Sequence, residues 1–240
     1  MKHWIKYALP APLRGMLNRA RNRMFPRYAR DSYSQEGEDL ILEHFLFCKP
    51  TGFYVDVGAH HPKRYSNTYR LYCRGWRGIN IDAKPGSMKE FERMRPRDIN
   101  VETGVGPVSG ELTFYVFHEP TVNTFDRTLA LQRVKDGFAM AEEVKVGVEP
   151  LSRILERNIP EGVRIDVLTV DVEGLDYEVL QSNDWDRFSP DYVLVECLGA
   201  LALSEIQSDQ IATFLMTRQY ALVAKTVNTV IFKLNTAKPC

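Results

Sequence analysis

Between residues 34 and 103, short apolar runs alternate with stretches that mix apolar and polar residues. The runs 53–57, 78–82 and 99–103 end at glycine or polar residues, as buried strands do. Between them, helices are predicted over 40–47, from the capping pair Ser66-Asn67 to Gly75, and over 85–94. This alternation of strands and helices predicts a parallel sheet.

The second half of the chain interrupts this pattern and then resumes it. Residues 111–117 and 144–148 alternate as half-exposed strands, so 104–148 is predicted to be an insertion over one edge of the sheet. Further elements follow in order: helix 151–157, strand 165–171, helix 174–181, strand 192–196, helix 204–218 and strands 221–225 and 230–234. The last two strands are separated by few residues and predict an antiparallel hairpin. The sequence therefore predicts an α/β, Rossmann-like, mostly parallel sheet with helices on both faces.

Charge changes this picture only at the start of the chain. The 240 residues contain 31 basic and 31 acidic side chains, so the chain as a whole has no field that would hold nucleic acid. Residues 1–30 form a basic arm with no acidic residue. The arm has three interpretations: peripheral contact with an anionic membrane, a removed targeting peptide, or packing on residues 31–240 or on a second subunit of a homo-oligomer.

The cysteines and the hydropathy favour a cytoplasmic protein. Cys48, Cys73, Cys197 and Cys240 show no metal-binding spacing and are expected to be reduced thiols. No apolar run approaches the ~20 residues that a membrane-spanning helix needs. The arm leaves peripheral membrane contact open. Residues 31–240 are predicted to form a single domain.

Acidic residues stand at the ends of the predicted parallel strands, where ligands of open α/β sheets bind. They are Asp56, Asp82, Asp171 and Glu196. After Asp56, Gly58 and Ala59 would let the backbone approach a ligand closely. The GxGxxG pattern of dinucleotide sites is absent, since His60, His61 and Pro62 follow. A single glycine after an acid suits a ligand without a pyrophosphate, such as one that carries an amine and a sulfonium.

Each remaining candidate residue has a structural alternative. Asp82 would accept hydrogen bonds from the two ribose hydroxyls of an adenosine, or cap the helix near Pro85. Asp171 and Glu173 would pair with the ligand's amine, bind a metal or take a proton, or else cap and brace the next helix. No metal is expected, because hard cations need more oxygen ligands than these residues supply. Gln35 would fold over the cofactor or cap its own helix.

Several motifs occur together in one order: residues 34–39 (SQEGED), 55–62 (VDVGAHHP), 66–68 (SNT), 75–82 (GWRGINID) and 171–174 (DVEG). In this order they resemble the FkbM-type methyltransferases, a branch of the class I S-adenosylmethionine enzymes. The resemblance covers residues 32–196 and leaves out the basic arm. It implies a sheet of seven strands with an antiparallel last hairpin, S-adenosylmethionine as cofactor, and often O-methylation of sugars or polyketide hydroxyls.

The expected reaction is in-line methyl transfer from S-adenosylmethionine to a hydroxyl of a sugar, glycan or related small molecule. The expected cofactor contacts are Gln35, Asp56, Gly58, Ala59, Asp82 and Asp171. The candidate bases are His60, His61, Asp171 and Glu173, with His118 a weaker one. Two other functions are weighed: a catalytically silent S-adenosylmethionine-binding protein and a nicotinamide-dependent oxidoreductase. The missing GxGxxG argues against the oxidoreductase.

Overall fold

The computed structural model describes residues 30–197, 202–206 and 208–236. All but residue 30 of the basic arm 1–30 lies outside these ranges, as does Cys240. Residues 33–240 form one unit, and the fold described here is that of this unit. Cys73 and Cys197 are free thiols. Across the described ranges, no helix combines the length and the apolar character needed to span a membrane.

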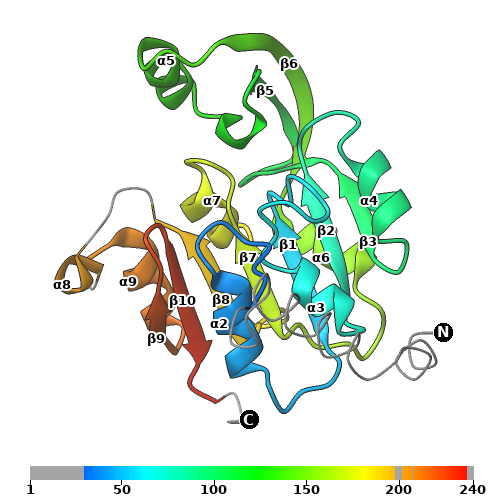
Figure 1. Cartoon of the computed structure of the whole chain (residues 1–240). Coiled ribbons are helices and arrows are strands. Elements are labelled where there is room, and N and C mark those ends of the chain that lie inside the picture. Colours follow the sequence, from blue (N-terminus) through cyan, green and yellow to red (C-terminus); the bar gives the residue numbers. More distant parts are fainter. Residues whose placement is uncertain (1–29, 198–201, 207, 237–240) are drawn as a thin grey trace, which may run out of the picture. The chain divides into compact units, whose positions relative to one another are not determined.

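The core of the unit is a sheet of seven strands in the order β3-β2-β1-β7-β8-β10-β9 (Figure 1). The strands are β1 (Phe53–Val57), β2 (Arg77–Asp82), β3 (Ile99–Glu102), β7 (Val167–Val170), β8 (Tyr192–Glu196), β9 (Tyr220–Lys225) and β10 (Thr229–Leu234). The first five run parallel, and β10 runs antiparallel to both β8 and β9. The predicted mostly parallel sheet with an antiparallel last hairpin is confirmed.

Helices pack on both faces of this sheet, as predicted. One face is covered by α6 (Leu151–Asn158), α7 (Asp176–Gln181) and α9 (Gln210–Thr217), which share one apolar core with β1, β2, β7 and β8. The other face carries α2 (Glu38–Phe45) and α3 (Tyr69–Cys73), whose buried side chains pack against Tyr54 of β1 and the fully buried Trp76. The helix α4 (Met88–Met94) precedes β3. Because adjacent residues of a strand point to opposite faces, Tyr54 and Val55 belong to different cores.

The segment 104–148 differs most from the expectation. It contains a second, three-stranded sheet in the order β4-β6-β5, built from β4 (Gly104–Val105), β5 (Gly110–Phe117) and β6 (Met140–Glu149). Between β5 and β6 lie the short helix η2 (Pro120–Val122) and the helix α5 (Arg127–Lys135), which was not predicted. Figure 1 shows these elements in green beyond one end of the large sheet. Asp126 starts α5, since its carboxylate accepts hydrogen bonds from the N–H groups of Thr128 and Leu129.

Several predicted boundaries differ from the structure, and two of the differences change an element. The single helix expected over 204–218 is divided into α8 (Leu203–Ile206) and α9, because Asp209 caps α9 by accepting from the N–H groups of Ile211 and Ala212. The strand expected over 165–171 is shorter, and β7 covers only Val167–Val170. Asp171 therefore lies in the turn after the strand rather than in the strand itself.

Candidate active site

A pocket opens at the carboxyl ends of β1, β2 and β7. Its walls come from the turn after β1, the turn after β2, the turn after β7 and the insertion, together with Gln35 before α2. The lining includes Gln35, Gly58, His60, His61, Asp82, Asp171 and Glu173, which the sequence analysis had singled out. Phe114, Asn123 and Phe125 line it from the insertion. β1 sits between β2 and β7, at the switch point where α/β sheets bind ligands.

Gly58 is required for a reason that the sequence did not suggest. Its φ is +79°, and a Cβ at this position would lie 1.7 Å from the carbonyl oxygen of Asp171. The backbone therefore approaches closely where two neighbouring strands, β1 and β7, end. This contact requires a glycine whether or not a ligand in the pocket also approaches it. Any side chain at position 58 would push the turn after β1 away from Asp171.

Asp82 organises the turns on either side of the pocket. Its Oδ2 accepts a hydrogen bond from the His60 N–H at 2.9 Å, and its Oδ1 accepts one from the Lys84 N–H at 2.8 Å. Burial raises the pKa of this carboxyl, whereas the two N–H groups favour its ionised form. A carboxylate has about four acceptor positions. Asp82 therefore keeps acceptor capacity for a ligand in the pocket that it lines.

Asp56 and Ala59, both expected to contact the cofactor, are not among the lining residues of this pocket. The Asp56 carboxylate accepts a hydrogen bond from the Thr68 hydroxyl and faces Arg95 on the opposite side of the strand. Ala59 packs with Met88 and Phe91. The structure therefore places these two residues behind the turn that forms the pocket wall.

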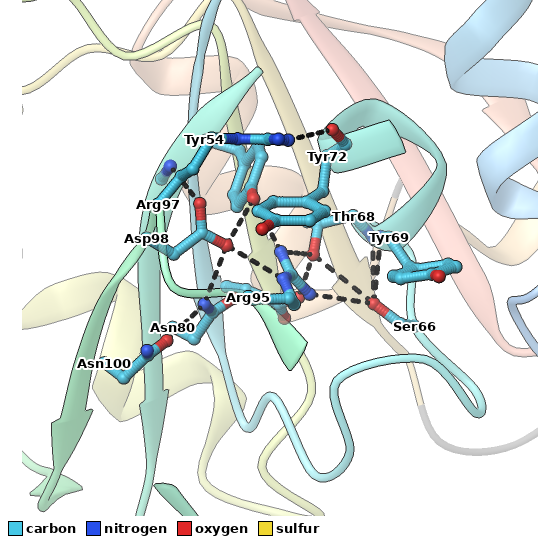
Figure 2. A network of polar contacts seen from close by, with 12 residues as sticks. Tyr54, Ser66, Thr68, Tyr69, Tyr72, Asn80, Arg95, Arg97, Asp98 and Asn100 are labelled. Carbon is cyan, nitrogen blue, oxygen red and sulfur yellow. Dashed lines mark hydrogen bonds and ion pairs between the residues drawn. The ribbon is translucent and has the colours of Figure 1, made fainter. Parts of the chain in front are cut away.

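Figure 2 shows the polar network to which Asp56 belongs. At its centre Arg95 donates to Asp98 at 2.8 Å, to the Tyr54 hydroxyl at 2.7 Å and to the Thr68 hydroxyl at 2.9 Å. The side chains of Arg95 and Asp98 are 0% exposed. Asp98 also accepts from the Gly78 N–H at 3.0 Å. The Arg95 and Asp98 charges therefore each have several partners.

A group of three carboxylates lies at the carboxyl ends of β7 and β8, and two of them, Asp171 and Glu173, line the pocket. Carboxylate oxygens of Asp171, Glu173 and Glu196 all lie within 4.8 Å of one another. Glu173 is paired with Arg133 of the insertion. Within the ranges that the structure describes, no hydrogen bond reaches the Asp171 carboxylate, and Oε2 of Glu196 is buried without a partner. We call these three residues the acid end of the pocket.

The pKa values of the acid end reflect burial and mutual repulsion. Burial, reinforced by the neighbouring Glu196, raises the pKa of Asp171 well above its usual range. Burial and the charge of Glu173 raise the pKa of Glu196 to about 8. Burial also raises the pKa of Glu173, and Arg133 opposes that effect. Such a group favours a bound cation or a shared proton. The three residues could hold a metal ion with one oxygen each, although hard cations take about six or more ligands.

The insertion holds the turn that carries Glu173. Arg133 donates to the Val122 carbonyl at 2.7 Å as well as to Glu173, and the Thr124 hydroxyl donates to the Glu173 carbonyl at 2.8 Å. Glu173 itself has a left-handed backbone with a φ of +58°. An arginine on a polar helix gives no signal of such a role in the sequence, so Arg133 was missed.

The two candidate histidines have different environments. Nε2 of His60 is buried without a partner in the described residues, and burial with nearby cations lowers the pKa of this imidazole to about 4. His60 is therefore neutral at pH 7. Nδ1 of His61 accepts from the N–H groups of Lys63 and Arg64 at 3.0 and 2.9 Å. His61 thus closes a turn, and His118 is absent from the pocket lining.

The family model of the methyltransferase FkbM domain matches residues 56–220 of the chain. Among solved structures, the chain is similar to an O-methyltransferase from Bacillus cereus in complex with SAH, with 10% sequence identity, 94% of this chain and 91% of that chain covered, and a TM-score of 0.35. No curated protein matches the sequence.

Proposed function

The chain belongs to the FkbM methyltransferase family, and we propose that it transfers the methyl group of S-adenosylmethionine to a hydroxyl of a sugar, glycan or related small molecule. The observation that carries this proposal is the position of Asp82 and Asp171. They lie at the ends of the strands on either side of β1 and line the same pocket. Both keep acceptor capacity toward that pocket.

The residues present fit this cofactor chemically. S-adenosylmethionine would supply an electrophilic methyl group on a positively charged sulfur, together with a ribose and an amine. Asp82 would accept from the ribose hydroxyls, and the acid end offers negative charge to a cationic group. Gln35 lines the pocket and would contribute an amide to the same ligand.

Asp171 is the best placed of the candidate bases. It lines the pocket, its carboxylate has no hydrogen-bond partner among the described residues, and its raised pKa gives it more proton affinity than an ordinary aspartate. Glu173 is neutralised by Arg133, His61 is engaged in its turn, and the pKa of about 4 makes His60 a weak base. In this proposal Asp171 accepts the hydroxyl proton, and the walls of the pocket orient the acceptor oxygen.

Calorimetric titration with S-adenosylhomocysteine tests the cofactor. We expect Asp82→Ala to weaken binding by about 1–3 kcal/mol, the loss of hydrogen bonds to a charged acceptor. Asp82→Asn keeps an acceptor for the two turns and separates ligand binding from local disorder. Glu102→Gln, at the end of the next strand and outside the pocket lining, is the matched control.

Failure of the wild-type protein to bind S-adenosylhomocysteine would reject the cofactor, and protection by NAD instead would favour an oxidoreductase. Binding without turnover on any acceptor would indicate a silent binding protein.

A further inference from the structure

The insertion reaches the acid end of the pocket through a buried arginine, Arg133 of α5. This residue is 8% exposed and is not part of the pocket lining. Its Nη2 pairs with the Glu173 carboxylate, and its Nη1 donates to the Val122 carbonyl at 2.7 Å. Val122 ends η2, whose first two residues line the pocket. Arg133 therefore joins one wall of the pocket to the turn after β7.

The insertion also fixes the backbone of that turn. Glu173 and Gly174 have φ values of +58° and +110°, and the left-handed region is one that residues with a Cβ avoid. The Thr124 hydroxyl donates to the Glu173 carbonyl at 2.8 Å, and a Cβ at Gly174 would lie 3.1 Å from Cδ2 of Leu129 in α5. The insertion thus holds both the backbone and the side chain of Glu173, two residues after Asp171.

Asp171, the proposed base, is surrounded by other carboxylates. Those that face it are Glu196 of β8, Asp176 of α7, Glu173 of its own turn and Asp56 of β1. Each of them raises the pKa of Asp171, because a second negative charge nearby disfavours ionisation. Glu36, before α2, adds to the same repulsion at Glu196. The group therefore needs a cation if one of its members is to stay unprotonated.

Arg133 supplies positive charge to this group. It opposes the effect of burial on the pKa of Glu173, and it also opposes the raised pKa of Glu196. Removal of a cation increases the proton affinity of the acids around it, and interacting acids titrate as one group. Without Arg133 the acid end would therefore hold its protons to a higher pH. A carboxyl that already holds a proton cannot accept another from a hydroxyl.

We propose that Arg133 is a positioning residue of the methyl transfer: it holds Glu173 as its charged partner and so keeps Asp171 free to accept the proton of the acceptor hydroxyl. Arg133 acts through Glu173, since it does not line the pocket itself. The insertion then contributes to the reaction as well as to the pocket wall. This inference rests on the proposed function, because it assumes that Asp171 is the base.

A carboxyl-carbon NMR titration of the full chain tests the electrostatic part without turnover. We expect Arg133→Met to raise the pH at which the acid end loses its protons by about 1–3 pH units, the usual effect of one close opposite charge. Arg133→Lys should keep most of the wild-type midpoint, because the charge remains. Arg127→Met removes an exposed cation of the same helix and should leave the midpoint unchanged. An unchanged midpoint in Arg133→Met would overturn the proposal.

The pH profile of kcat separates a positioning role from a merely structural one. In Arg133→Met the acid limb of the profile should move to higher pH, in parallel with the NMR midpoint. At a pH below the wild-type limb, kcat should then fall about tenfold for each pH unit of displacement, because the ionised fraction of the base falls by that factor. Activity should recover as the pH is raised. A loss of kcat that is equal at every pH would overturn the proposal.

The double variant Arg133→Met/Glu173→Gln tests whether the arginine acts through Glu173. Glutamine removes the negative charge that Arg133 compensates, so the two positions again carry no net charge. We expect the limb and the midpoint to return toward their wild-type values, and kcat at low pH to be partly rescued. A double variant whose limb stays as displaced as in Arg133→Met would overturn the proposal.

Failure of this inference can be distinguished from failure of the proposed function. Titration with S-adenosylhomocysteine and a melting curve show for each variant whether the pocket and the fold are intact. Lack of turnover by the wild-type protein with every acceptor would reject the proposed function, and the role of Arg133 with it. Turnover by the wild-type protein, with a midpoint that Arg133→Met leaves unchanged, would reject the role of Arg133 alone.

Discussion

Two groups of buried charges lie on the same sheet, and they differ in how completely each charge is compensated. Around Arg95, four different side chains accept from one guanidinium, and Asp98 receives further donors from Gly78 and Asn80. At the acid end, Glu173 has its arginine, but no partner is described for the Asp171 carboxylate and Oε2 of Glu196 has none. The Arg95 network is the more deeply buried of the two, since the side chains of Arg95 and Asp98 are 0% exposed whereas the three residues of the acid end are half-buried.

The difference indicates what each group does. Buried charges are tolerated when they are paired and hydrogen-bonded, and a fully satisfied network fixes one arrangement of the chain. The Arg95 side chain joins β1, the start of α3 and the segment before β3. This network lies behind the pocket wall. Uncompensated carboxylates beside a pocket, in contrast, destabilise the fold unless a ligand or a proton is present. Removal of a charge from the Arg95 network should therefore unfold the protein, whereas removal of a charge from the acid end should stop its reaction.

The largest effect is expected from Asp171→Asn, which removes the proposed base. The asparagine keeps the size of the side chain and cannot take a proton, so kcat should fall by ~10²–10⁴. Titration with S-adenosylhomocysteine and a melting curve check that cofactor binding and folding survive. Asp186→Asn, at an exposed position, is the matched control. A variant that keeps more than about a tenth of wild-type kcat would exclude Asp171 as the proton acceptor.

A large effect of the other kind is expected from Arg95→Met. The thioether side chain fills part of the space but leaves Asp98 and Asp56 buried without their cation. Removing one partner of a buried ion pair costs about 3–5 kcal/mol of unfolding free energy. Urea unfolding measures this loss. Activity per folded molecule should change far less than in Asp171→Asn.

Tyr54→Phe is the control for Arg95→Met. It removes one hydroxyl from the network but leaves Arg95 paired with Asp98, so the loss should be about 0.5–1.5 kcal/mol. If both variants lost the same free energy, the stability of the network would not depend on the guanidinium.

The sequence predicted the carboxylates of the pocket better than the Arg95 network, and the reason is physical. Asp82 and Asp171 could be placed in one pocket because parallel strands end at the same edge of a sheet, whatever the details of packing. Asp56 lies within β1, in register with Asn80 rather than with Asp82, and its carboxylate faces Thr68 and Arg95. That pairing depends on residues far along the chain, which no local pattern reveals.

The helix α5 was missed for a related reason. Its sequence is polar on most sides, and Leu131 and Val134 remain exposed, so it lacks the apolar stripe by which helices are recognised. Its contribution to the site, the contact between Arg133 and Glu173, is made by a charged residue rather than by core packing.

The last of the expected effects sharpens the comparison most, because removal of a charge should stabilise the fold at the acid end and destabilise it in the Arg95 network. Glu196 has a pKa of about 8 in the folded protein and an ordinary value of 4.5. As the pH rises from 4.5 to 8, the unfolded chain releases this proton while the folded chain retains it, so the free energy of unfolding falls through this window. The charged groups around Glu196 are Asp171, Glu173, Asp176, Arg133 and Glu36.

Glu196→Gln removes that pH dependence and should make the protein more stable at pH 8.5 than the wild type, by about 1–3 kcal/mol, whereas the two should converge near pH 4.5. Chemical unfolding at both pH values measures the difference. An identical pH dependence in both proteins would mean that Glu196 is ionised at little cost, and the acid end would then resemble the Arg95 network. A gain at high pH, together with a loss of activity, would mean that the fold keeps an unfavourable carboxylate because the reaction uses it.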